Sequence, residues 1–398
     1  MNEIYQTAIV GGGAAGIMAA VELTCGKSAF KGEDILLLER NDRVGKKLVA
    51  TGNGQGNLTN AHMSADFYYG KKPFIEHYIA NEKRVNLKKY LSDLGIILTE
   101  SKDGKMYPVS KQASAVVDVL RGYLKLKGVK ETVGSEVQSI EKRKDFFLIK
   151  TKDDSYRART VIVAVGGAAA KQFGTDGTQY KLLENLGHEK TELYPSLVQL
   201  KTELGPIRGL KGLKETATVK AFVGAKEVKR ATGDLLFTEF GVSGSSIFTV
   251  SSALAGKKDC HLEVEFVPEL TKEQIEKEIS RRKTTPDVFK ENVLIGLMNK
   301  RIGQAVLKTA KSDTASDIAR AVKEFRLSVV GNLGFNYAQV TRGGIVTDDI
   351  DGQTYQSKLH DGLYVVGEVL DVDGDCGGYN LAFAFVSAIT AARSIKRI

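Results

Sequence analysis

Three glycines and one glutamate near the start of the chain have the spacing of a dinucleotide-binding turn. Gly11, Gly13 and Gly16 form a GxGxxG motif, and Glu39 follows 23 positions after Gly16. Glycine allows a tight turn and lets main-chain N–H groups approach a pyrophosphate at the positive end of the following helix. A glutamate at this distance accepts hydrogen bonds from a ribose that has no 2′-phosphate.

The elements around these residues favour that interpretation over a purely structural glycine turn. Residues 4–10 and 34–40 are apolar and predict two buried strands, and residues 17–23 predict a helix between them. The turn then opens the helix and the glutamate ends the second strand. A βαβ unit that binds a dinucleotide is therefore expected.

Composition and cysteine spacing limit the kind of protein. The chain has 398 residues, of which 42% are hydrophobic and 26% charged, as in a globular protein of two or three domains. It has no run of about 18 apolar residues and no basic leader, so we expect a cytoplasmic protein with no membrane partner. Cys25, Cys260 and Cys376 lie far apart. This spacing argues against a disulfide scaffold and a metal site, so redox chemistry would need a bound cofactor.

Part of the net charge of +9 is concentrated in one segment of the chain. Residues 208–230 carry seven lysines and arginines against Glu215 and Glu227. A solvated face explains most such segments. The alternative is an anionic partner, with RNA ahead of a membrane surface.

Three glycine-rich segments further along the chain are also candidates for a site. Residues 42–60 predict a long loop, in which Lys46 and Lys47 could reach phosphates and the main chain of 52–57 could wrap a flat ring; a flexible linker is the alternative. A buried strand over 160–165 leads into Gly166. A strand over 362–366 leads through DVDGDCGGYN, residues 371–380, to an apolar helix over 381–395. The glycines before that helix could present N–H groups to an anionic reduced flavin.

The remaining segments predict the helices and strands between the glycine-rich segments. Helices are expected over 68–98 and 113–126, a connection over 106–108, and strands over 134–140 and 146–151. After residue 193, short alternating segments (197–200, 217–222, 262–266) predict a small antiparallel barrel or sandwich. Residues 234–248 suggest a loop folded toward the ligand. Residues 271–327 have a basic, amphipathic helical pattern that Pro286 interrupts.

Taken together, the motifs resemble the BaiN/RdsA-like family of FAD-dependent oxidoreductases, also called YhiN-like or aminoacetone-oxidase-like. The resemblance covers nearly the whole chain and rests on GGGAAG, LLLER, GKKLVATGNGQGNLTN, LLFTEFGVSGSS, VTRGGIV and GEVLDVDGDCGGYN, in that order. It implies an α/β fold: a Rossmann-type FAD-binding domain, as in two-dinucleotide-binding-domain flavoproteins, interrupted by a β-barrel and a helical subdomain. We expect the FAD domain at 1–192 and 340–398, the barrel at 193–270 with part of 328–339, and the helical part at 271–327.

The resemblance also assigns residues to the cofactor. It implies that the pyrophosphate is held by Gly11, Gly13, Ala14, Ala15 and Gly16, the adenosine ribose by Glu39 with Arg40 beside it, and the adenine by the main chain of Val137. It places along the ribityl chain and ring Lys47, Leu48, Thr51, Gly52, Asn53, Gly54 and Asn57. It places around the flavin Gly166, Gly367, Glu368, Gly378, Tyr379, Asn380 and Leu381.

Two departures from the family concern the substrate more than the flavin. Many relatives have Gly-Gly-Gly-Arg-Cys-Asn where this chain has GNGQGN at 52–57. They often have a histidine and a proline where this chain has Glu239 and Ser245.

The catalytic candidates are Cys376 and Tyr379, with Glu239 and His188 as further proton donors or acceptors. Cys376 precedes a glycine pair at a helix N-terminus, which would lower a thiol pKa; a small packing residue is the alternative. Tyr379 could equally pack or hydrogen-bond locally, and a lone histidine is usually structural.

Three functions remain open from the sequence. The first is an NAD(P)H-driven reductase of an activated C=C bond, in an enone or in ribosomal RNA bound through the basic insert. With a single GxGxxG, NAD(P)H would bind only transiently. The second is an oxygen-using oxidase of a small amine such as aminoacetone, and the third a flavin-bound RNA-binding or assembly factor. The oligomeric state is open.

Overall fold

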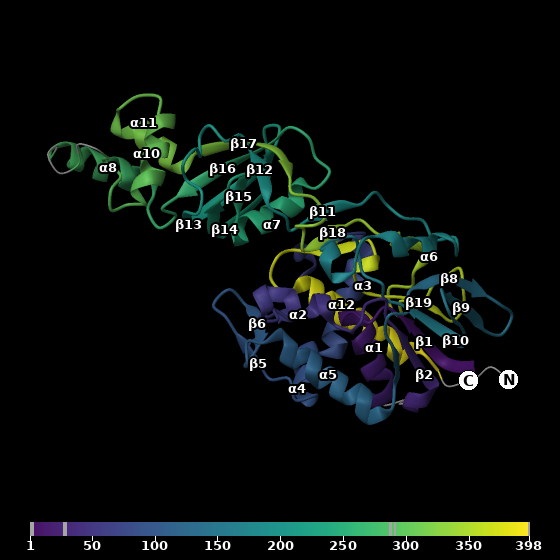
Figure 1. The fold of residues 1–398 in the computed structure, drawn as a ribbon. Coiled ribbons are helices and arrows are strands. Elements are labelled where there is room, and N and C mark those ends of the chain that lie inside the picture. The colour runs from purple at the N-terminus through teal and green to yellow at the C-terminus, as the bar shows by residue number, and fades with distance from the viewer. Residues whose placement is uncertain (1–3, 27–29, 286–288, 290–291, 397–398) are drawn as a thin grey trace. The chain divides into compact units, whose positions relative to one another are not determined.

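The computed structural model describes residues 4–26, 30–285, 289 and 292–396. It divides into two compact units (Figure 1). Unit 1 consists of Met1–Leu193 and Val340–Ile398, and unit 2 is the continuous segment Tyr194–Gln339. Both ends of the chain therefore contribute to one unit.

Unit 1 is built on a seven-stranded sheet in the order β7-β2-β1-β10-β9-β8, with β19 also paired to β10. The bounds are β1 Ile4–Val10, β2 Ile35–Leu38, β7 Lys130–Thr132, β8 Val137–Lys142, β9 Phe147–Thr151, β10 Ser155–Val163 and β19 Leu363–Val365. The neighbours of β1 are parallel to it, and Val10 pairs with both Leu38 and Val163. These three strands thus end level, and the residues that follow them meet at one edge of the sheet.

Two apolar helices, α1 Ala14–Cys25 and α12 Tyr379–Ser394, pack on each other in unit 1. Both are buried over most of their length because their sequences are apolar all round, as expected of core helices. The other helices of unit 1 are α2 Lys46–Ala50, α3 Lys72–Val85, α4 Leu87–Asp93, α5 Ala113–Lys127 and α6 Lys181–Glu184. Its short strands are β3 Thr59–Asn60, β4 Tyr68–Gly70, β5 Leu98–Glu100, β6 Lys105–Pro108, β18 Val340–Arg342 and β20 Val372–Gly374.

Unit 2 is a closed barrel in the order β12-β15-β14-β13-β16-β17. Alternate side chains of β13 (Ala217, Val219 and Ala221) point into its core, as the period of two requires. The strands are β12 Leu200–Thr202, β13 Lys214–Val223, β14 Lys226–Phe237, β15 Gly241–Ser243, β16 Cys260–Phe266 and β17 Phe325–Asn332, and β11 Tyr194–Ser196 precedes them. The helices are α7 Ser245–Leu254, α8 Lys272–Lys283, α10 Lys300–Thr309 and α11 Ala315–Lys323, coloured green in Figure 1.

Several local predictions are wrong. Residues 42–60 are not one loop, because they contain α2, a 3₁₀ turn at Thr51–Gly54 and β3. The segment 68–98 holds two helices between short strands, and 106–108 lies within β6. The expected loop at 234–248 is a strand pair followed by α7, and the helical region 271–327 ends in β17. Pro286 lies outside the described residues.

Candidate functional site

In the turn between β1 and α1, two of the three motif glycines have close neighbours and the other one faces open space. Gly11 has φ +105°, and a Cβ there would lie 2.4 Å from the carbonyl oxygen of Ala164. A Cβ on Gly16 would lie 1.8 Å from the carbonyl oxygen of Gly11. A Cβ on Gly13 would meet nothing within 4 Å. The first and third glycines of the motif are thus required by packing, and the middle one leaves space at the N-terminus of α1.

Glu39 is positioned by hydrogen bonds at the same edge of the sheet. It is 7% exposed, and its Oε2 accepts from the main-chain N–H of Gly12 at 2.7 Å. Its Oε1 accepts from the main-chain and side-chain nitrogens of Asn41 at 2.8 and 2.7 Å. Because a carboxylate offers about four acceptor positions, Oε2 can accept a further hydrogen bond from a ligand hydroxyl.

The segment before β8 lies beside Glu39. The main-chain N–H of Ser135 donates to the carbonyl oxygen of Glu39 at 2.9 Å, and Val137 begins β8 with 2% exposure. Arg40 forms ion pairs with Glu136 and Asp176 at 3.2 and 3.0 Å. The structure therefore brings the three residues predicted to surround the adenosine (Glu39, Arg40 and Val137) to one place.

A second group of predicted residues meets around Glu368. The Nζ of Lys47 lies 2.7 Å from Glu368 Oε2, and Glu368 Oε1 accepts from the main-chain N–H of Thr341 at 3.0 Å. The Thr341 hydroxyl accepts from the N–H groups of Ala168 and Ala169 at 2.8 and 3.0 Å. This network joins α2, the turn after β10 and the turn after β19, and it leaves the Lys47 cation half-buried.

Thr341 was not predicted from the sequence. It is 1% exposed, and a Cβ on Gly167 would lie 2.4 Å from its hydroxyl oxygen. The Thr341 hydroxyl therefore binds the main chain of the turn that begins at Gly166, where φ is +75°. The only signal nearby is the glycine pair at 343–344 in VTRGG, which indicates a close main-chain approach but does not identify the partner.

The segment after α2 exposes main chain. Gly52, Asn53, Gly54 and Gly56 all have positive φ, and residues 52–55 are exposed. Leu48 is 1% exposed and anchors α2 in the core, and Thr51 donates its hydroxyl to the carbonyl oxygen of Leu48 at 2.7 Å. Leu48 thus supports this segment from beneath.

Two asparagine side chains hydrogen-bond to the main chain of the turn that precedes α12. Gly378, the N-cap, has φ +97°, and a Cβ there would lie 2.3 Å from the carbonyl oxygen of Thr59. The Asn57 amide accepts from the N–H of Gly378 at 3.1 Å and donates to the carbonyl oxygen of Thr59 at 3.2 Å. Asn380 bonds both the N–H and the carbonyl oxygen of Gly374 at 2.8 Å. Asn57 and Asn380 therefore hold the turn that leads into α12, with Leu381 half-buried behind it.

Tyr379 is held in an aromatic cluster. Its ring stacks on Phe67 with centroids 4.7 Å apart, and its hydroxyl donates to the carbonyl oxygen of His62 at 3.3 Å. Burial raises the pKa of Tyr379 to about 12, so the hydroxyl stays protonated at neutral pH.

The expected activation of Cys376 is wrong. Burial raises the pKa of the Cys376 thiol, and this effect outweighs the attraction of Lys105 for the thiolate. The other two candidates lie elsewhere. His188 is 3% exposed and contacts the Ser357 hydroxyl through Nε2 at 3.0 Å, with burial lowering its pKa. Glu239 lies in unit 2 and pairs with Lys211 at 2.6 Å.

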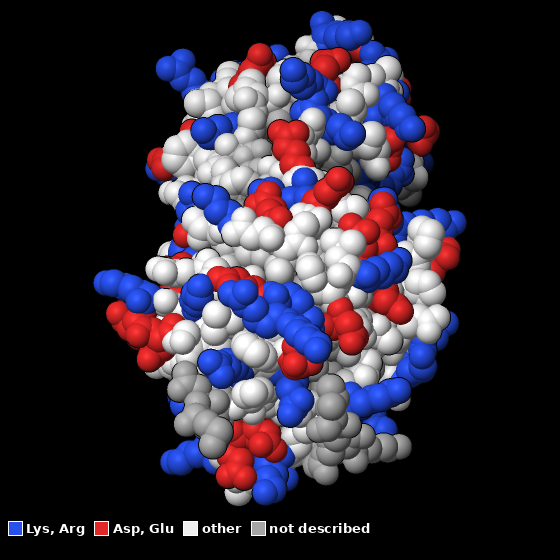
Figure 2. Space-filling model, turned by 90° about the vertical axis from the view of Figure 1, so that its right-hand side faces the viewer, with Lys and Arg blue, Asp and Glu red and all other residues white. Residues whose placement is uncertain are grey.

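Many cations of the basic segment 208–230 have acidic partners. Lys214 pairs with Asp234 at 3.2 Å, Arg230 with Glu227 at 2.6 Å, and Lys220 with Glu265 at 3.6 Å. The face in Figure 2 likewise shows basic and acidic side chains interspersed. Within the described residues, no helix combines the length and the apolar character that crossing a membrane requires.

Comparison with known proteins gives matches over nearly the whole chain. A family model described as the HI0933-like protein Rossmann domain matches residues 5–394. The chain is 33% identical over 411 residues to the 3-dehydro-bile acid delta(4,6)-reductase of Clostridium scindens, and the match covers 99% of each. It is 26% identical over 415 residues to the ribosomal RNA dihydrouridine synthase of Haemophilus influenzae, and the match covers 100% of each.

A solved structure shows the same fold. The 3-ketosteroid-delta4-(5alpha)-dehydrogenase of Rhodococcus jostii RHA1 matches with a TM-score of 0.53 and 15% identity, over 99% of this chain and 97% of that one. These matches confirm the resemblance drawn from the motifs and the predicted fold class, an α/β Rossmann-type unit with a barrel insert.

Proposed function

This chain belongs to the HI0933-like family of FAD-dependent oxidoreductases, and we propose that it is an NAD(P)H-driven reductase of an activated C=C bond. The observation that supports a bound FAD is the turn before α1, which is closed by packing at Gly11 and Gly16 and open at Gly13. Two relatives of full length have names that describe reduction at carbon–carbon double bonds, in a bile acid and in uridine. We expect one FAD per chain.

The residues of unit 1 fit FAD in three places. N–H groups at the N-terminus of α1 suit a pyrophosphate, because the space beside Gly13 is free and the helix dipole favours negative charge. Oε2 of Glu39 can accept from a ribose hydroxyl. The exposed main chain of 52–55 and the turns at Gly166 and Gly367, both with positive φ, would run beside the ribityl chain and ring.

The chain's own groups would tune the reaction. A bound flavin transfers hydride through its N5, so the protein supplies position, charge and protons. Lys47 is paired with Glu368 at 2.7 Å, and the remaining N–H groups of its ammonium could donate hydrogen bonds to the ring. Tyr379 and Cys376 both hold their protons at neutral pH, so both remain candidate proton donors.

We favour a small enone over RNA as the substrate. Because acidic partners neutralise several cations of 208–230, this segment offers less charge to a phosphate backbone than its sequence suggests. RNA and a small amine are the alternatives that the experiment below separates.

The test is anaerobic stopped-flow spectroscopy of the FAD-loaded protein. We expect NADH or NADPH to bleach the visible flavin band, an enone such as 4-androstene-3,17-dione to restore it quickly, and air to restore it slowly. Faster recovery with unmodified ribosomal RNA than with the enone would instead indicate an RNA substrate. No bleaching by either nucleotide, with bleaching by aminoacetone and fast recovery in air, would contradict the proposal and indicate an oxidase.

A further inference from the structure

Two histidines join the loop after α6 to the turn before β19 in unit 1. Nε2 of His188 lies 3.0 Å from the hydroxyl oxygen of Ser357. Nε2 of His360 lies 2.7 Å from the carbonyl oxygen of Leu186. His188 is 3% exposed and Ser357 is 4% exposed, so this pair is too buried to act on a substrate. A buried histidine that is held by one hydroxyl is instead a candidate for a pH-sensitive contact.

The hydrogen bonds of Ser357 determine which ring nitrogen of His188 carries the proton. The Ser357 hydroxyl oxygen accepts from the main-chain N–H groups of Leu359 and His360, both at 3.1 Å. A hydroxyl has two acceptor positions and one O–H, so both acceptor positions are used and the O–H is left for His188. Nε2 therefore accepts from Ser357, and the proton of the neutral ring is on Nδ1. That Nδ1 is buried and has no hydrogen-bond partner in the part of the chain that the structure describes.

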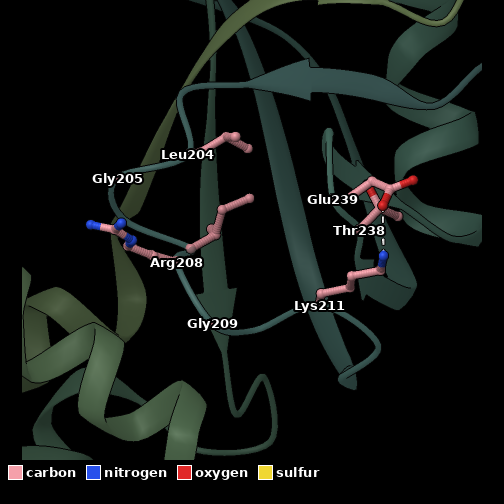
Figure 3. Close-up of a pocket in the computed structure, with 8 residues that line it drawn as sticks. Leu204, Gly205, Arg208, Gly209, Lys211, Thr238 and Glu239 are labelled. Carbon is pink, nitrogen blue, oxygen red and sulfur yellow. Dashed lines mark hydrogen bonds and ion pairs between the residues drawn. The ribbon is translucent and has the colours of Figure 1, made fainter.

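This arrangement suits a neutral imidazole and not a charged one. A protonated ring carries an N–H on both nitrogens. The new N–H at Nε2 would face the Ser357 oxygen, whose acceptor positions are already used, and the N–H at Nδ1 would still have no acceptor. A buried charge without hydrogen bonds is unfavourable. The ammonium of Lys211 shows the usual alternative, because it lies on an exposed surface and pairs with Glu239 at 2.6 Å (Figure 3).

The effects of the surroundings on His188 act in opposite directions. Burial is the largest effect and lowers the pKa of His188, the carboxylate of Asp349 raises it, and the ring of His360 lowers it. The balance is a pKa below the usual 6.5. In the unfolded chain the imidazole has its usual pKa, so unfolding takes up a proton below pH 6.5. The stability that this contact contributes is therefore complete above pH 6.5 and decreases as the pH falls below it.

We propose that His188 and Ser357 form an acid-sensitive switch, which holds the turn before β19 at neutral pH and releases it at acidic pH. Protonation of Nε2 removes the acceptor of the Ser357 O–H and leaves a cation that water can solvate only if the turn opens. Opening also frees the N–H groups of Leu359 and His360 for exchange with water. This switch does not depend on the flavin chemistry proposed for unit 1.

Urea denaturation of the FAD-loaded full-length protein at pH 7.5 and 5.5 tests the switch. His188→Gln is the main variant, because a glutamine carbonyl can accept from the Ser357 hydroxyl and does not titrate. Between the two pH values, the unfolding equilibrium constant should rise about fivefold more in the unmodified protein than in His188→Gln. Ser357→Ala should also reduce the pH dependence, because the neutral ring loses its donor.

Amide hydrogen exchange locates the change. In the unmodified protein the protection factors of Leu359 and His360 should decrease from pH 7.5 to 5.5, and in His188→Gln they should not. The matched control is His360→Gln, since Nε2 of His360 donates to the Leu186 carbonyl in both charge states and a glutamine amide can replace it. This variant should keep the pH dependence of the unmodified protein.

An equal pH dependence in the unmodified protein and His188→Gln would overturn the proposal. So would a loss of the pH dependence in His360→Gln, or a protection factor of Leu359 that does not change with pH in the unmodified protein. The melting temperature of each variant at pH 7.5 verifies that it is folded. The visible flavin spectrum, recorded on the same samples, reports separately on FAD binding.

Discussion

In unit 1, the apolar helices α1 and α12 both follow a glycine N-cap, and the two glycines have different surroundings. At α1, packing closes the turn around Gly11 and Gly16, but the space beside Gly13 is free. At α12, Asn57 accepts from the N–H of Gly378, and the carbonyl oxygen of Thr59 lies against that glycine. The sequence predicts an anion-binding end for both helices.

The difference shows that a glycine before a helix has two distinct uses. It can keep Cβ atoms away from a ligand, or it can let another segment of the protein approach closely. At α1 the first use is available. At α12 the second use is seen, because a Cβ on Gly378 would lie 2.3 Å from the carbonyl oxygen of Thr59 in β3.

The largest effect is expected at the closed part of the α1 turn. Gly16→Ala would place a Cβ 1.8 Å from the carbonyl oxygen of Gly11, and main chain cannot yield as a flexible side chain does. We expect the free energy of unfolding to decrease by about 3 kcal/mol, measured by urea denaturation. Unchanged stability in this variant would contradict the packing described for the turn.

Gly13→Ala sharpens the contrast within the same turn. Its Cβ meets nothing within 4 Å and its φ of −78° suits alanine, so we expect a normal melting temperature. If the pyrophosphate lies there, FAD should bind about tenfold more weakly, measured by titration of the apoprotein. Full FAD affinity would place the cofactor elsewhere.

Asn57→Ala tests the hydrogen bonds that hold the turn before α12. It removes the acceptor of the Gly378 N–H and the donor to Thr59, so unfolding should become easier by about 1 kcal/mol. The matched control is Asn53→Gly in the same loop, because Asn53 is exposed and its φ of +54° is free for glycine. Equal losses in the two variants would mean that Asn57 does not cap α12.

The smallest effect concerns the thiol beside α12. Because burial raises the pKa of Cys376 above its usual 9.0, the thiolate fraction at pH 8 is small and grows as the pH rises. In a protein with Cys25→Ser and Cys260→Ser, alkylation by iodoacetamide should still accelerate above pH 9. A rate that levels off below pH 8 would indicate a thiolate stabilised by an open helix N-terminus.

Local features of the site were predictable from the sequence. The roles of Gly11 and Gly16 depend on one strand–turn–helix unit, whose geometry the spacing of the motif determines. The turn around Gly378 was located correctly for the same reason, since a glycine pair before an apolar segment indicates a helix start. The hydrogen bond from the Gly378 N–H to Asn57 was not predictable, because Asn57 lies more than 300 residues away in the chain.

The errors have a physical reason as well. Thr341 bonds Ala168 across 173 positions, and no local pattern reports such a contact. The segment 234–248 looks like a loop because glycine and serine favour turns. In the structure Gly244, with φ +108°, ends the short strand β15, and the serines after it begin α7. The same residue types serve turns and helix starts, so composition alone did not separate the two.

The split of unit 1 around a continuous unit 2 sets an order of events during synthesis. When residue 193 leaves the ribosome, β10 lacks its neighbour β19 and α1 lacks α12. The ribosome then needs about 7–29 s to make unit 2, residues 194–339, at about 5–20 residues per second. Unit 2 can fold as it emerges, while the apolar surfaces of α1 and β10 stay uncovered until residues 340–398 are made. The nascent chain is thus most prone to aggregation and to chaperone capture during that interval.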